Sequence, residues 1–202
     1  MSGVPILVEG RALRVLVVGG GSVATRKAKQ FGDAGAEVRV VAPALTEELE
    51  SYALEQALRV ERRSYRAEDI DDAHLVIAAT DDRAVNAANA VDAHGAHRLV
   101  NVADLPDDGT FATMATHRRG ALTIGVSAGG VPSAATRIRD ALAERFDARY
   151  GDALHELRAL RRALLARGEA ELWRARAAEL IDERFCDIVE HGGLPERIAS
   201  WR

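Results

Sequence analysis

The sequence lacks most of the features that mark secreted, membrane and nucleic-acid-binding proteins. Cys186 is the only cysteine in 202 residues, so a disulfide framework and a cysteine-rich metal site are excluded. No apolar run approaches the roughly 18 residues of a membrane span, and Met1 to Pro5 contain no charged start of a signal peptide. The formal net charge of -4 argues against a general nucleic-acid or membrane-surface binder. These absences predict a cytoplasmic globular protein, in which an anionic ligand must meet a local cluster of arginines.

One stretch combines a buried strand, a glycine-rich turn and the start of a helix. Residues 15–24 have the order expected of a dinucleotide-binding unit, with the pattern G-x-G-x-x-A. Gly19 permits the turn, Gly21 lets the backbone approach a pyrophosphate, and Ala24 lets the helix pack against the strand. Free N–H groups at the helix start would then bind the phosphates. Glycine-rich turns also occur where no nucleotide binds, so a tight turn alone is the alternative.

The residues around this turn add two observations. Arg26 and Lys27 lie near the helix start, where the dipole disfavours cations, so either a bound anion offsets them or both side chains reach water. An acidic residue normally follows the second strand and binds the adenosine ribose, but that place holds Val41, Ala42 and Pro43. The choice between NAD and NADP therefore stays open.

The order of the expected elements indicates an α/β protein. The alternation predicts a Rossmann-like, doubly wound parallel sheet with right-handed crossovers. A hairpin with strands at 111–117 and 121–127 and a turn at 118–120 should follow, and then helices from Ser133 to the end, with breaks at 150–152, Gly168 and 192–193. Within the α/β part, strands are expected at 15–18, 37–41, 58–65, 75–80 and 99–102, and helices at 22–34, 47–56 and 83–94.

This organisation divides the chain into three parts. We expect a nucleotide-binding Rossmann domain over residues 1–110, a hairpin-and-helix segment over 111–149 and a helical region over 150–202. The apolar stripe of the last region is too narrow for an independent core, so these helices should pack on the hairpin or on a second subunit. A homodimer is therefore expected. The stripe consists of Leu154, Leu157, Leu160 and Leu164.

Polar residues follow two of the buried strands at the edge where open α/β sheets bind ligands. Thr80, Asp81 and Asp82 end one strand, and Asn101 and Asp104 lie at the end of the next. Asp81 and Asp82 have an equally good interpretation as helix caps. Asp104 is either a positioned base or a turn-forming residue. Arg62 and Arg63, on the third strand, are interpreted as a solubility device of an edge strand.

Four short islands stand in register along the chain: residues 18–24 (VGGGSVA) followed by Arg26 and Lys27, 78–82 (AATDD), 101–104 (NVAD) and 126–130 (VSAGG). In order and spacing these islands resemble the precorrin-2 dehydrogenase family, which includes the amino-terminal module of siroheme synthase. The resemblance runs from about Pro5 to Phe146. Met114 and Ala128 depart from the family pattern, which typically has a proline and in some members a serine at these places.

The resemblance implies NAD-dependent oxidation of precorrin-2 to sirohydrochlorin on the way to siroheme or cobalamin, with Asp104 as the catalytic carboxylate. It also implies a Rossmann domain, a dimerisation segment and a small helical region. In some members the same carboxylate supports insertion of iron, while others only oxidise, so ferrochelatase activity is left open. The expected cofactor-binding residues are Gly19, Gly20, Gly21, Ser22, Val23, Ala24, Thr80 and Asp81.

Precorrin-2 carries many carboxylates, so cations are expected near its site. The arginines among the candidates have an alternative interpretation as ordinary turn and helix surface. His117 is a candidate for metal handling by proximity alone, and a lone strand histidine is more often structural. No metal-binding residues are predicted. The expected substrate-binding residues are Asn101, Arg118, Arg119, Ser127, Gly129, Gly130 and Arg137.

Two other classes of function remain open from the sequence. A regulatory module could bind NAD through a Rossmann domain and change an oligomer without chemistry, and a structural dimer could have lost its activity. The missing ribose acid counts against a conventional sensor. The polar residues at 101–104 count for an enzyme.

Overall fold

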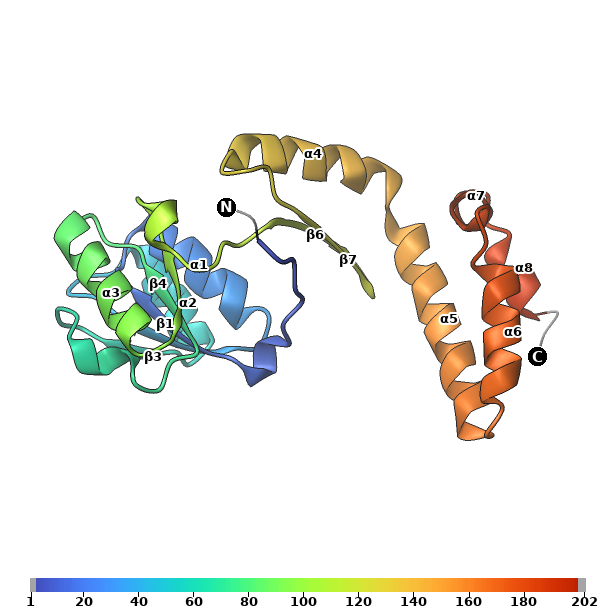
Figure 1. Cartoon of the computed structure of the whole chain (residues 1–202), viewed down its shortest axis with the longest axis horizontal. Coiled ribbons are helices and arrows are strands. Elements are labelled where there is room, and N and C mark those ends of the chain that lie inside the picture. The colour runs from blue at the N-terminus through green and yellow to red at the C-terminus, as the bar shows by residue number, and fades with distance from the viewer. Residues whose placement is uncertain (1–2, 200–202) are drawn as a thin grey trace. The chain divides into compact units, whose positions relative to one another are not determined.

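The computed structural model describes residues 3–199, which form two compact units that divide between Thr113 and Met114 (Figure 1). The expected boundaries after residues 110 and 149 stay predictions, and the helical pattern expected for 200–202 lies outside the described residues. Within residues 3–199, no helix is both long and apolar enough to cross a membrane.

The first unit is a parallel five-stranded sheet in the order β3-β2-β1-β4-β5. The chain crosses from β3 over β2 and β1 to β4, so the strand order changes direction between β1 and β4, and the predicted Rossmann-like doubly wound fold is confirmed. The strands are β1 (Arg14–Val18), β2 (Glu37–Val41), β3 (Arg59–Glu61), β4 (Leu75–Ala78) and β5 (Leu99–Val102). The helices are α1 (Ser22–Gly32), α2 (Glu47–Glu55) and α3 (Arg83–Gly95), with short 3-10 turns η1 (Gly10–Ala12), η2 (Ala67–Ile70) and η3 (Pro106–Asp108).

The alternation of apolar side chains along β1 supplies both layers of the core. Val17 belongs to the cluster that includes Ala24 and Ala28 of α1, whereas Leu16 belongs to the cluster that includes Ala90 of α3. Successive strand residues point to opposite faces, so one apolar strand contacts both helix layers. Burial of each large aliphatic side chain contributes roughly 1.5 to 3 kcal/mol. Packing on both faces of the sheet therefore fixes the end of β1, from which the glycine-rich turn begins.

The edge strand β3 is shorter than the expected run 58–65, because the chain leaves the sheet for an ion network. Asp69, on η2, accepts hydrogen bonds from the Arg63 guanidinium at 2.6 and 2.8 Å and from the Arg66 N–H at 2.8 Å. Burial raises the pKa of Asp69, but these hydrogen bonds outweigh it and hold the pKa below its usual value. Arg62 and Arg63 lie just beyond β3 and both form ion pairs, Arg63 also with Glu61 and Arg62 with Glu50 on α2, while their interpretation as a solubility device stays a prediction.

The second unit consists of an antiparallel hairpin followed by helices. The hairpin pairs β6 (Ala115–Arg119) with β7 (Leu122–Val126) through a turn at Gly120 and Ala121. The expected start at residue 111 is wrong, because the Phe111 N–H donates to the Val100 carbonyl and its ring packs in the first unit's core. The helices are α4 (Pro132–Arg145), α5 (Ala148–Ala166), α6 (Ala170–Leu180), α7 (Phe185–Glu190) and α8 (Leu194–Ala199).

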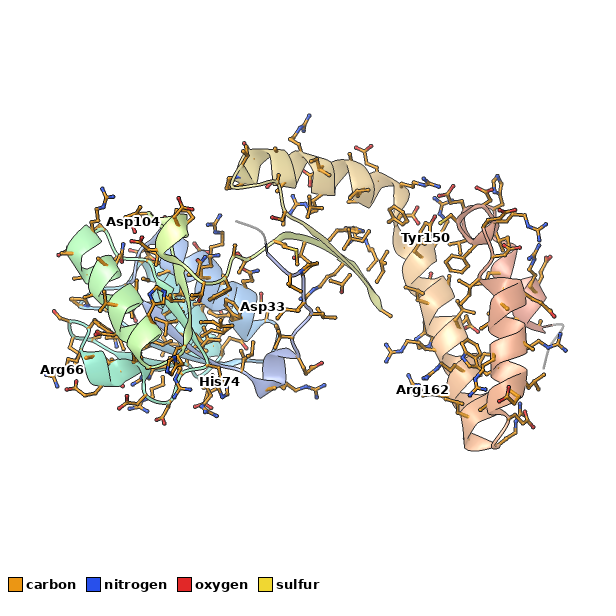
Figure 2. The ribbon with its side chains drawn as sticks, in the orientation of Figure 1. Asp33, Arg66, His74, Asp104, Tyr150 and Arg162 are labelled. Atoms are coloured by element: carbon orange, nitrogen blue, oxygen red, sulfur yellow. The ribbon has the colours of Figure 1, made fainter. Side chains whose placement is uncertain are left out.

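Helix α5 passes without interruption through the expected break at 150–152. Gly151 is needed there for a close approach: a Cβ atom at this position would lie 2.8 Å from the Arg119 carbonyl oxygen. Tyr150 is buried, and its hydroxyl donates to Glu190 on α7 at 2.7 Å (Figure 2).

The helices α5 to α8 also have their own apolar core, which corrects the expectation that they are too thin for one. Their packing includes partly buried Leu122 of the hairpin. The buried members of this core are Tyr150, Ala153, Leu157, Leu160, Leu164, Leu180, Val189, Leu194 and Ile198. The narrow stripe therefore gives no support to a homodimer.

Candidate functional site

The glycine-rich turn is built from three glycines with different constraints. Gly19 has φ +121°, and a Cβ atom there would lie 2.2 Å from the Ala79 carbonyl oxygen, so the turn requires glycine. A Cβ atom on Gly20 would lie 1.9 Å from the Ala44 carbonyl oxygen. Around Gly21, by contrast, an added Cβ atom would meet nothing within 4 Å. Two glycines therefore let the backbone fold onto itself, and the third faces open space.

Helix α1 begins directly after this open glycine. Gly21 is its N-cap residue, no side chain caps the helix start, and Ser22 and Val23 are exposed. Beneath the turn, the Thr46 N–H donates to the Gly20 carbonyl and the Thr25 hydroxyl to the Gly21 carbonyl, both at 2.9 Å. The carbonyls are thus held toward the protein. The first N–H groups of α1 are available to an anion such as a pyrophosphate.

The small residue expected to let α1 pack on the sheet does so, and of the two interpretations of Lys27 the one in which its side chain reaches water is wrong. Ala24 is fully buried in the core. Lys27 is 7% exposed rather than extended into water, and its Nζ donates to the Thr113 hydroxyl at 2.5 Å. Burial, with a smaller contribution from the charge of Arg26, lowers the Lys27 pKa to about 8. This ammonium tethers the end of the first unit to α1.

Asp104 lies at the carboxyl edge of the sheet, two residues beyond β5. Figure 2 shows it at one edge of the first unit, with His74, which precedes β4, at the opposite edge. Its Oδ1 atom accepts a hydrogen bond of 2.8 Å from Nδ2 of Asn86 on α3. The Asn86 Oδ1 atom in turn accepts the Thr80 N–H at 3.0 Å. Thr80 follows β4, so one buried amide links the ends of two neighbouring strands.

This linkage also reaches the glycine-rich turn. A Cβ atom on Gly19 would lie 3.1 Å from the Thr80 nitrogen, so the two segments are in contact. The structure therefore brings the turn, Thr80 and Asp104 to one edge of β1, β4 and β5, which are adjacent in the sheet. Open α/β sheets bind ligands at this edge, where the strand order reverses.

The other polar residues at this edge have structural partners or lie on its surface. Asp82 caps α3, because its carboxylate accepts the N–H groups of Ala84 and Val85 at 2.8 and 3.3 Å. Asp81 is exposed. The Asn101 side chain donates to the Phe111 carbonyl at 3.0 Å and thereby fixes the segment that follows β5.

The remaining expected substrate-binding residues lie on the second unit. Arg118 and Arg119 are exposed at the end of β6, and Arg137 is exposed on α4. Ser127 follows β7 and is also exposed. Their assignment stays a prediction. Gly129 and Gly130 have φ angles of +56° and +89° and open surroundings, which allows the turn into α4.

His117 has a structural environment. It is buried on β6, and its Nε2 atom lies 2.6 Å from the carbonyl oxygen of Phe146, just beyond α4. No group of three or more His, Cys, Asp or Glu side chains that could hold a metal ion occurs within residues 3–199.

Asn86 was not predicted from the sequence. A signal was present, because Asn86 and Asn89 share the buried face of α3 with Ala90 and Ala93. A polar residue on an otherwise apolar helix face needs a buried hydrogen-bond partner. Its partners, at positions 80 and 104, are set by the fold rather than by neighbouring sequence.

Comparisons with known proteins agree with this geometry. A family model described as "Putative NAD(P)-binding" matches residues 6–115, more than half of the chain. The solved structure of "SirC, precorrin-2 dehydrogenase" has a TM-score of 0.78, is 29% identical, and the match covers 98% of this chain and all of that one.

Curated relatives point the same way. The siroheme synthase of Saccharophagus degradans is 35% identical over 98% of this chain, and that of Pseudomonas putida is 41% identical over 75%. The chain spans 42% and 33% of the lengths of these two relatives. The precorrin-2 dehydrogenase of Priestia megaterium is 34% identical over 77% of this chain and 78% of its own length. The chain therefore belongs to the precorrin-2 dehydrogenase family, within the NAD(P)-binding Rossmann proteins.

Proposed function

We propose that this chain catalyses the NAD-dependent dehydrogenation of precorrin-2 to sirohydrochlorin in siroheme biosynthesis. The observation that carries the proposal is the shared sheet edge, where the open Gly21 at the start of α1 accompanies a hydrogen-bonded carboxylate, Asp104. The names of the Priestia megaterium relative and of the SirC structure support the choice of substrate.

The cofactor site of this proposal is the turn and first helical residues of α1, together with the end of β4. The N–H groups after Gly21 bind the pyrophosphate, and the absent Cβ of that residue leaves room for it. Thr80 and Asp81 border the site beyond β4. The proposed cofactor-binding residues are Gly19, Gly20, Gly21, Ser22, Val23, Ala24, Thr80 and Asp81.

Oxidation of precorrin-2 removes a hydride and a proton from the reduced ring. NAD⁺, when bound, accepts the hydride and becomes NADH. Asp104 takes the proton, and the electron pair of the bond that held this proton forms the new double bond, while the hydride carries its own pair to the cofactor; Asp104 then releases the proton to solvent. Asn86 holds one carboxylate oxygen by a hydrogen bond, so the other can face the substrate. The net reaction yields sirohydrochlorin, NADH and a proton.

The substrate carries carboxylates, so the residues proposed to bind it include cationic ones. Arg118, Arg119 and Arg137 are exposed and can donate paired hydrogen bonds to carboxylates. The turn from Ser127 to Gly130 offers backbone groups and one hydroxyl. Asn101, although occupied by the Phe111 carbonyl, completes the proposed set at the end of β5.

A homodimer in the cytoplasm is part of the proposal. Within α4 only Ala135 is buried. Ile138 is 48% exposed, and Val131, the N-cap residue of α4, is 52% exposed. A two-stranded hairpin with one thinly packed helix is marginal alone, so a second copy would supply the missing contacts. Sedimentation as a monomer at micromolar concentration would contradict this part.

The test is the variant Asp104→Asn, which keeps shape but removes the basic carboxylate. Purified protein is mixed with precorrin-2 and NAD⁺, and the visible spectrum and NADH formation are followed. We expect turnover to fall by about 100- to 10,000-fold, the range for a lost general base, while the Kd for NAD⁺ stays within about threefold. Asp108→Asn, an exposed carboxylate on η3, is the matched control and should retain wild-type turnover. Turnover of Asp104→Asn close to wild type would refute the role of Asp104.

A further inference from the structure

Asn86 is a completely enclosed polar residue with hydrogen bonds to both sides of the site. Its side chain is 1% exposed, and it lies in the first turns of α3. The Nδ2 atom donates to the Thr80 carbonyl at 3.0 Å and to Asp104 Oδ1 at 2.8 Å. The Oδ1 atom accepts the Thr80 N–H at 3.0 Å and lies 2.8 Å from the Thr80 hydroxyl. A buried amide with all its groups engaged is rigidly held.

The partners fix which way this amide points. The backbone N–H of Thr80 can only donate, so the atom facing it is the oxygen. The backbone carbonyl of Thr80 can only accept, so the atom facing it is the nitrogen. The remaining N–H of Asn86 is therefore directed at Asp104, and the Asp104 carboxylate receives a donor.

We infer that Asn86 is a positioning residue for Asp104: it fixes one carboxylate oxygen and leaves the other for the proton transfer. This inference rests on the proposed function of Asp104 as the base. Asp104 itself is on an exposed loop two residues beyond β5, where backbone contacts alone hold a side chain loosely. The bond to a buried residue of α3 ties the loop to the rigid part of the fold. Catalytic geometry depends on such support, because small displacements cost large factors in rate.

The linkage also requires an amide at position 86. An aspartate of the same shape could accept the Thr80 N–H, but its second oxygen would face the Thr80 carbonyl and the Asp104 carboxylate. An apolar side chain would leave the Thr80 N–H without its buried acceptor. Only a group that accepts on one side and donates twice on the other satisfies all these partners.

The experiment compares Asn86→Ala with Asn89→Ala in the purified full chain. Asn89 is a matched control, because it is equally buried on the same face of α3 but donates to the Val85 carbonyl and not to Asp104. With precorrin-2 and NAD⁺, we expect kcat of Asn86→Ala to fall about 10- to 100-fold, with both KM values within about threefold. Asn89→Ala should keep kcat within about threefold. If Asn86→Ala does not fold, Asn86→Leu, which has a similar shape and fills the buried site but has no donor, carries the same expectation.

A double-mutant comparison separates this inference from the proposed function. In the Asp104→Asn background the carboxylate is already gone, so adding Asn86→Ala should change kcat by less than about threefold. Equal losses in Asn86→Ala and Asn89→Ala would overturn the inference, as would a full additional loss in the double variant. A weaker Kd for NAD⁺ with unchanged kcat would also overturn it. If Asp104→Asn alone retains full turnover, the proposed role of Asp104 fails first, whatever Asn86 does.

Discussion

The open space around Gly21 leads to a prediction that separates folding from cofactor binding. Gly21 has φ -80° and ψ -174°, an extended conformation that any residue adopts, and an added Cβ atom meets nothing within 4 Å. Gly21→Val should therefore leave the free energy of unfolding within about 1 kcal/mol of wild type. The new methyl groups would occupy the place of the pyrophosphate at the start of α1. We expect the Kd for NAD⁺ to rise at least about 100-fold, which corresponds to roughly 2.7 kcal/mol.

The measurements are urea unfolding and calorimetric titration with NAD⁺ and, beside it, NADP⁺. Gly20→Ala is the contrasting variant, because its Cβ atom would lie 1.9 Å from the Ala44 carbonyl oxygen. It should lose roughly 1 to 3 kcal/mol of stability, the range for overpacking. A folded Gly21→Val variant with the wild-type Kd for both nucleotides would refute the placement of the cofactor at this turn.

Two further predictions concern buried charges of the first unit. Asp69→Asn should lower the free energy of unfolding at pH 7 by roughly 2 to 4 kcal/mol, while the exposed neighbour Glu68→Gln should change it little in the same urea titration. Since folding lowers the Asp69 pKa, the ionised carboxylate stabilises the fold above the unfolded-state pKa, and this stabilisation is lost as the pH falls through the folded-state pKa. If Asp69→Asn leaves the pH dependence of unfolding in acid unchanged, this explanation is contradicted. Lys27→Met should be neutral or stabilising at pH 7, because folding lowers the Lys27 pKa from 10.5 to about 8. The free energy of unfolding of the wild type, measured relative to that of Lys27→Met, should then rise between about pH 8 and 10. A difference that does not change with pH would refute the lowered pKa of Lys27.

The elements set by local sequence could be predicted well. The strand expected at 37–41 has the same bounds as β2. Its signals, the apolar residues and the glycine shortly before them, lie within or next to the strand itself. Asp82 caps α3, which was one of its two interpretations, and Thr46 caps α2 in the same way. Gly19 takes the positive φ angle that the turn requires. In each case a hydrogen bond or steric limit within a few residues decides the structure.

Features set by distant contacts could not be predicted in this way. Gly151 was interpreted as a helix break, but it serves the approach of α5 to the Arg119 carbonyl, which is 32 positions away in the chain. Phe111 begins an apolar run that is typical of a hairpin strand, yet it belongs to the first unit, where its N–H donates to the Val100 carbonyl. Neither interpretation of Lys27, a cation offset by a bound anion or one in water, included its hydroxyl partner on Thr113, which is 86 positions away.

The candidate site likewise combines a part that is set by local sequence with a part that is set by distant contacts. The turn at Gly19–Gly21 is a local motif, and Asp104 was identified by family resemblance, but the physical connection between them runs through contacts that only the fold creates. Gly19 lets the end of β1 lie against Thr80, and Thr80 presents its N–H and carbonyl to Asn86, which reaches Asp104. Because β4 lies between β1 and β5, these contacts run from the end of β1 past the end of β4 to the residues that follow β5. The sheet order therefore brings the proposed base, Asp104, to the same edge as the glycine-rich turn, although the two are 85 positions apart in the chain.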